Sequence, residues 1–128
     1  MDDDARGPWP VPSRAHFAAA LEALDIEANA IELGGAGTRV PVMIAAFADA
    51  VAGRAEAGFS RAARERIERA AAVAAEQRRE SLVVLFSHPR HAAQVAGAPN
   101  VLCAWGGERA MQAAAARVIA RRSAAPPG

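Results

Sequence analysis

The chain has 128 residues, of which 52% are hydrophobic and 23% are charged, a composition typical of one folded domain and not of a disordered segment. Its net charge is +1, which excludes bulk electrostatic attraction as a basis for binding nucleic acid or an anionic membrane. The single cysteine, Cys103, excludes a disulfide within the chain and favours a reducing compartment.

The first four residues are acidic, and no apolar signal segment follows them. The most apolar stretch, residues 40–52, contains Asp49 and is too short to span a bilayer. We therefore expect a cytoplasmic protein with no membrane partner.

Residues 1–12, with three Asp and three Pro, predict a flexible N-terminal segment. A single domain follows over 13–122, and residues 123–128 predict a disordered tail. Within the domain, Ser13 is the expected N-cap of a helix that reaches Leu24. A short strand is predicted at 29–33. The Gly-rich residues 34–37 favour a turn over a phosphate-binding loop, because a second strand at 40–47 follows them where such a loop needs a helix.

The clearest helix opens at Ser60 and runs to Arg79. Glu and Arg alternate at i,i+4 on its solvated side, and an apolar stripe follows Ala63, Ile67, Ala70 and Ala74. Strands are predicted at 82–86 and 101–105, separated by a Pro loop with about one helical turn. The last helix begins after Gly107. Its residues expected to face inward are Met111, Ala114, Ala115, Val118 and Ile119.

This order predicts an α/β fold: a small, mostly parallel sheet with flanking helices, as in a flavodoxin-like α/β sandwich, either complete or incomplete. Residues 34–39 are too few for a crossover helix, so either the strands at 29–33 and 40–47 form a hairpin or the first is not part of the sheet. Strands 82–86 and 101–105 are expected to be adjacent interior strands. Their predicted buried residues are Val83, Leu85, Leu102 and Cys103.

No self-sufficient active site is predicted. His88, His91 and Cys103 offer three metal ligands without a typical spacing, and Cys103 in an apolar strand favours a small buried side chain. Asp49 and Glu56 share one loop, which favours a solvated pair over two catalytic carboxylates. We predict no catalytic residue, metal or cofactor.

Trp105 ends the last predicted strand and has two interpretations that the sequence leaves open. It stacks on a sugar or on a partner surface, or it covers the core beneath the last helix.

Residues 40–120 resemble the C-terminal α/β sandwich domain of glycoside hydrolase family 3, in particular its β-N-acetylhexosaminidase-like and β-glucosidase-like members. The resemblance follows the order of an apolar strand with a Gly-rich loop (42–58), a helix (60–79), a strand ending in a Pro loop (82–89), the stretch 98–107 and an Ala-rich helix (110–120). This chain differs where it has Ser-His-Pro-Arg at 87–90, because the family commonly has Gly-small-Pro followed by an aromatic residue. The family's nucleophilic Asp lies in a separate barrel domain that this sequence lacks.

The resemblance implies an accessory domain with a structural role or a role as a wall of the sugar site, inactive alone. It implies a barrel-type catalytic domain as partner, or self-association through an exposed apolar face near Trp105 and Phe47 or Phe59, and a carbohydrate as a possible ligand. The residues expected at the substrate-side rim are Asp49, Arg54, His88, Arg90, His91 and Trp105.

Two alternatives stay open. One is a small flavodoxin-like module that binds a nucleotide or another anion through Arg54, Arg90 and the helix N-termini at Ser60 and Gly107. The other is a gene remnant without function.

Overall fold

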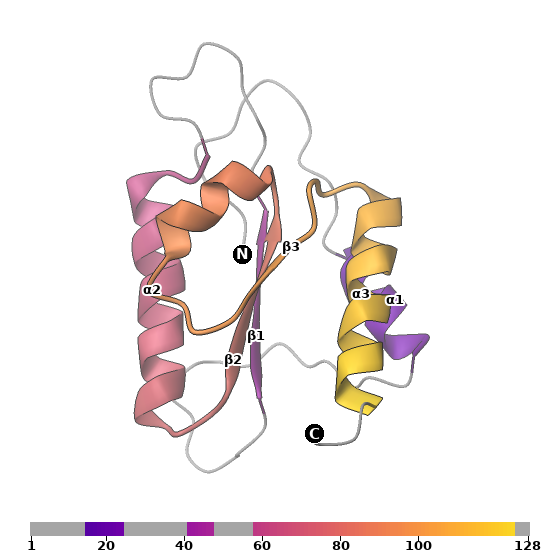
Figure 1. Ribbon diagram of the computed structural model, residues 1–128, viewed down its shortest axis with the longest axis horizontal. Helices are drawn as coiled ribbons and strands as arrows, with labels where there is room; N and C mark the ends of the chain where they lie inside the picture. The colour runs from indigo at the N-terminus through magenta and orange to yellow at the C-terminus, as the bar shows by residue number, and fades with distance from the viewer. Residues whose placement is uncertain (1–14, 25–40, 48–57, 125–128) are drawn as a thin grey trace.

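The computed structural model describes residues 15–24, 41–47 and 58–124, which form three layers (Figure 1). A parallel sheet lies in the middle. Helix α2 (Arg61–Glu76) and the 3-10 helix η1 (Pro89–Val95) lie on one side of it, and α1 (Ala15–Glu22) and α3 (Arg109–Ala124) lie on the other. The predicted fold class is confirmed: this is an α/β sandwich built on a small parallel sheet.

The sheet has three strands in the order β1 (Val42–Phe47), β2 (Ser81–Phe86) and β3 (Val101–Cys103), and both pairs of neighbours are parallel. β2 is the central strand, and its residues 83–86 are buried whichever face they point to. This explains the unbroken apolar run in the sequence, because a strand covered on both faces needs no polar alternation. The strand predicted at 29–33 lies outside the described residues.

Two hydrophobic cores share β2. Toward α2, Val83 and Leu85 pack with Ile67 and Phe59. Toward α1 and α3, Val84 and Phe86 form the second core with the residues Phe17, Phe47, Ala115, Ala116 and Ile119. Phe47 and Phe59, which were expected near an exposed apolar face, are both buried.

Helix α2 begins as predicted. The side chain of Ser60 accepts a hydrogen bond from the backbone N–H of Ala63 at 3.2 Å, which satisfies one of the free donors of the first turn. Arg61 and Glu65 form an exposed i,i+4 ion pair of 2.8 Å. The predicted apolar stripe is buried, and it belongs to the first core. Among the described residues, no helix combines the length and hydropathy needed to cross a membrane.

The last strand departs from prediction. β3 has three residues and, among the described strands, a single neighbour, so it lies at the sheet edge, and Leu102 and Cys103 are half-buried. The strand ends early because the backbone turns sharply at Trp105, which has a φ of 61°.

Helix α3 also departs from prediction at one position. Val118 was expected inside but is 42% exposed. Gln112 is fully buried and donates from Nε2 to the carbonyl oxygen of Gly107 at 2.6 Å. That hydrogen bond offsets part of the cost of burying a polar side chain. Met111 and Ala114, which were also expected to face inward, are half-buried.

Candidate functional site

The carboxyl ends of β2 and β3 bring two loops to one edge of the sheet. Ser87 and His88 follow β2, and Trp105 follows β3 by one intervening residue. Parallel strands end at a common edge, which is where ligands bind in open α/β sheets. We refer to the exposed side chains of His88, Arg90 and Trp105 at this edge as the rim.

Trp105 is the most exposed large apolar side chain in the described residues, at 66%. Its ring stands edge-on to that of His88, with 5.6 Å between centroids. The backbone N–H of Gly106 donates to the carbonyl oxygen of Ala104 at 2.7 Å, across Trp105. A bond over three residues with positive φ at the middle one is the rarer, strained form of the γ-turn. The turn therefore holds Trp105 in an unfavourable backbone conformation, with its indole exposed to solvent.

A hydrogen bond to the backbone also orients the ring of His88. As N-cap of η1, it accepts a hydrogen bond at Nδ1 from the backbone N–H of Arg90 at 3.1 Å. An Nδ1 that accepts a hydrogen bond leaves the proton of the neutral ring on Nε2. The rim thus presents an imidazole of defined orientation beside an indole face.

His91 lies beneath the rim and is buried. Its Nδ1 shares a hydrogen bond of 3.2 Å with Oγ of Ser87, which is also buried, and its ring packs against Phe59 and His88 at 6.3 and 6.0 Å between centroids. Burial lowers the pKa of His91 below its ordinary value, and the nearby His88 and Arg90 lower it further. The ring is therefore neutral at physiological pH and acts as a packed polar core group.

A residue that sequence reasoning missed fixes η1 to the start of α2. Gln94 accepts at Oε1 from the backbone N–H of Phe59 at 2.9 Å. The preceding residue, Gly58, has a φ of +93°, and a Cβ added there would collide with the amide of Gln94 and the ring of His91. The sequence signal for this contact was an isolated glycine, Gly58, shortly before the N-cap of α2. Its need for a positive φ becomes evident only in the folded chain.

Asp49 and Arg54, the remaining predicted rim residues, lie outside the described residues. Within the described segments, no three side chains of His, Cys, Asp or Glu are grouped so that they could hold a metal ion. The N-terminal site of α2 that the anion-binding alternative needs is occupied in part by the Ser60 side chain.

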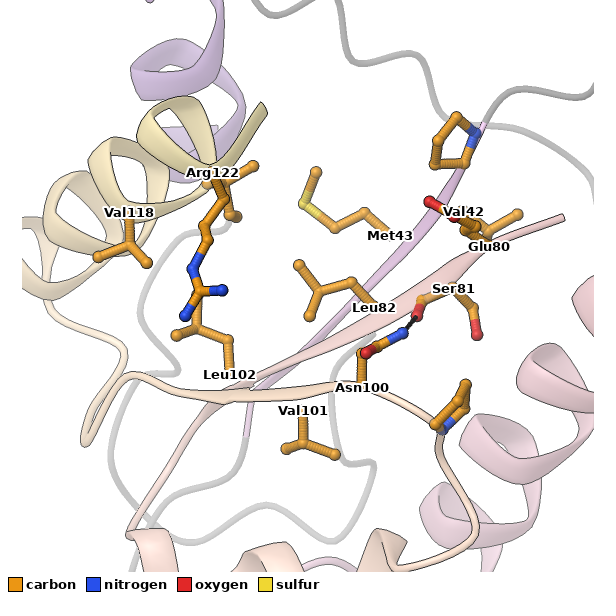
Figure 2. A pocket seen from close by; sticks show the side chains of 13 residues that line it. Val42, Met43, Glu80, Ser81, Leu82, Asn100, Val101, Leu102, Val118 and Arg122 are labelled. Carbon is orange, nitrogen blue, oxygen red and sulfur yellow. Dashed lines mark hydrogen bonds between the residues drawn. The ribbon is translucent and has the colours of Figure 1, made fainter. Parts of the chain in front are cut away.

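A second concave surface lies at the opposite, amino-terminal edge of the sheet. It is a groove of about 740 Å³ in which Met43, Leu82 and Leu102, one from each strand, form a row (Figure 2). Val118 and Arg122 of α3 lie along its side, and Asn100 donates from Nδ2 to the backbone oxygen of Ser81 at 3.1 Å. Sequence reasoning missed this groove because it assigned Val118 to the core.

Together these features define a small α/β sandwich with an aromatic rim at the carboxyl edge of a three-stranded parallel sheet. Comparison with protein-family models, curated proteins and solved structures finds no match for this chain.

Proposed function

We propose that this domain is an accessory α/β domain of the glycoside hydrolase family 3 type, and that its rim forms one wall of a carbohydrate site. The observation that carries the proposal is the geometry of Trp105, an indole 66% exposed on a strained turn and braced by His88. One face of a pyranose ring is a patch of C–H groups, which packs on an indole as other apolar groups do. The adjacent imidazole offers a donor for a sugar hydroxyl.

The ordered resemblance of residues 40–120 to the family's sandwich domain supports the choice of sugar: terminal β-linked glucosyl or N-acetylglucosaminyl residues. In this role the domain packs against a barrel-type catalytic domain in the reducing environment of the cytoplasm, where Cys103 stays a thiol. The bond-breaking groups belong to the barrel, so the domain alone binds without hydrolysing.

Thermal shift assays with glucose, N-acetylglucosamine, ATP and inorganic phosphate test the proposal. We expect the N-acetylglucosamine or glucose arm alone to raise the melting temperature, since a ligand that binds only the folded state stabilises it. The Trp105→Ala variant should lose this response. The matched Val118→Ala variant, which removes an exposed apolar side chain elsewhere, should keep it. Stabilisation by ATP or phosphate and by neither sugar would instead support the anion-binding alternative.

The purified chain should also release no aryl alcohol from aryl β-glucosides or aryl N-acetyl-β-glucosaminides above a buffer blank. The retaining mechanism needs a carboxylate nucleophile and a separate acid held on either side of the glycosidic bond. Turnover that the Asp49→Asn or Glu56→Gln variant abolishes would show that the chain is an enzyme in its own right.

A further inference from the structure

The groove at the amino-terminal edge of the sheet has no part in the proposed function, because the rim lies at the opposite edge. Its volume of about 740 Å³ falls within the range of small-molecule sites in proteins, roughly 300–1,000 Å³. Its floor is the row of Met43, Leu82 and Leu102, which pack against the second core and are half-buried (Figure 2). The floor therefore keeps apolar surface that a ligand can cover.

A cation stands over one end of this floor. Arg122, in the last turn of α3, is exposed, and Figure 2 shows its guanidinium between Leu102 and Val118. Helix α3 contains no Asp or Glu that could neutralise it. Within the described segments of the chain, no carboxylate forms an ion pair with this guanidinium. The groove thus offers a planar fork of N–H donors at the end of an apolar surface.

The other end of the groove has the opposite charge. Glu80 lines it, and Figure 2 shows this residue on the far side of Met43 and Leu82 from the guanidinium of Arg122. An anionic group in the groove is therefore attracted to one end and repelled from the other, which fixes the direction in which an elongated ligand lies.

We propose that this groove binds a free aliphatic carboxylate of medium chain length. The carboxylate pairs with the guanidinium of Arg122, whose donors match the two carboxylate oxygens. The alkyl chain lies along the floor from Leu102 over Leu82 to Met43. Neighbouring strands are about 4.8 Å apart, so this row is about 10 Å long. An extended chain of roughly eight carbons spans that length, because it advances about 1.2 Å per bond.

Isothermal titration calorimetry of the full chain with octanoate, below its critical micelle concentration, measures the binding. We expect saturable binding of one octanoate per chain. Octyltrimethylammonium, which has the same alkyl chain and the opposite charge, should bind at least roughly tenfold more weakly if the guanidinium selects the head group. Butyrate, which has the same carboxylate and a shorter chain, should also bind at least roughly tenfold more weakly, because each buried methylene contributes to affinity.

Charge reversal at two adjacent arginines separates the groove from the general charge of the helix. Arg122→Glu should reverse the preference, so that octyltrimethylammonium binds more tightly than octanoate. Arg121→Glu is the matched control: it changes the net charge by the same amount at an exposed position that does not line the groove, and should leave octanoate binding unchanged. Met43→Gln, which makes the floor polar, should weaken octanoate several-fold. Trp105→Ala should leave octanoate binding unchanged, so this site is tested independently of the sugar site.

Three results would overturn the proposal. One is the absence of octanoate binding at millimolar concentration. Another is tighter binding of octyltrimethylammonium than of octanoate to the wild-type chain. The third is an equal loss of octanoate binding in Arg121→Glu and Arg122→Glu, which would show that the attraction comes from the basic end of α3 as a whole and not from the groove.

Discussion

The imidazole of His88 stands edge-on to the indole of Trp105, at 5.6 Å between ring centroids, although the two residues belong to loops after different strands. The arrangement depends on two local constraints. His88 is oriented by the backbone N–H of Arg90, and Trp105 is projected by a turn with positive φ. The His88 hydrogen bond caps η1, whereas the turn at Trp105 contributes to neither hydrophobic core.

The conformation of Trp105 leads to a first prediction. A residue other than glycine at φ 61° costs about 1–2 kcal/mol, which Trp105→Ala retains and Trp105→Gly relieves. We expect the glycine variant to be more stable than the alanine variant by roughly 1 kcal/mol in urea unfolding. Leu24 is exposed and has no positive φ, so the Leu24→Ala variant should be more stable there than the Leu24→Gly variant. The same order at both positions would contradict the strain.

Gly58 provides a second prediction. Gly58→Ala places a Cβ against Gln94 and His91 at a φ of +93°, and should destabilise the domain by about 1–3 kcal/mol. Gly97→Ala is the matched control, because a Cβ there meets nothing within 4 Å. Its midpoint in urea should stay at or slightly above the wild-type value. Equal midpoints for the two variants would show that Gly58 is not constrained.

The buried His91 gives the pH dependence of stability. Its pKa is lower in the folded state than in the unfolded chain, so the unfolded state binds the proton more tightly. The free energy of unfolding is therefore undiminished by His91 above the ordinary histidine pKa of about 6.5. It falls as the pH decreases through that value toward the lower pKa of His91 in the folded state. The His91→Gln variant should lose this decline, whereas His88→Gln, at an exposed position, should retain it. Urea unfolding at a series of pH values measures both.

We expect the central strand β2 to tolerate a charged side chain less well than the edge strand β3. Val84→Asp puts an unpaired carboxylate at a fully buried position of the central strand, which costs several kcal/mol and should unfold the domain. Leu102→Asp, on the half-buried edge strand, should leave a cooperatively melting protein. Circular dichroism on heating separates the two. An unfolded Leu102→Asp variant would place β3 in the interior of a larger sheet.

Local patterns predicted the elements that depend on local physics. The apolar run at 82–86 identified the central strand, and Ser60 with its following stripe identified α2, because burial on both faces and N-capping leave direct sequence signals. The edge position of β3 could not be predicted, since an apolar run does not reveal how many neighbours a strand has.

The candidate site was predictable only in part. His88, Arg90 and Trp105 were predicted as rim residues because they lie close to the ends of predicted strands. Which histidine faces solvent depends on the 3-10 geometry of η1, which buries His91 and exposes His88. The role of Gln94 depends on a hydrogen bond to Phe59, far away in sequence. Likewise, apolar periodicity alone does not encode the burial of Gln112, with its hydrogen bond to Gly107, or the exposure of Val118.

The central claim is that the exposed indole of Trp105 contacts a sugar. Its most direct test is the indole N–H resonance of Trp105 in a Trp9→Phe variant, which leaves this indole as the only one in the chain. Titration with methyl β-glucoside and methyl N-acetyl-β-glucosaminide should move that resonance saturably for at least one sugar, and the His88→Ala variant should weaken the response. An indole resonance that stays in place for both sugars up to their solubility limit would contradict the account.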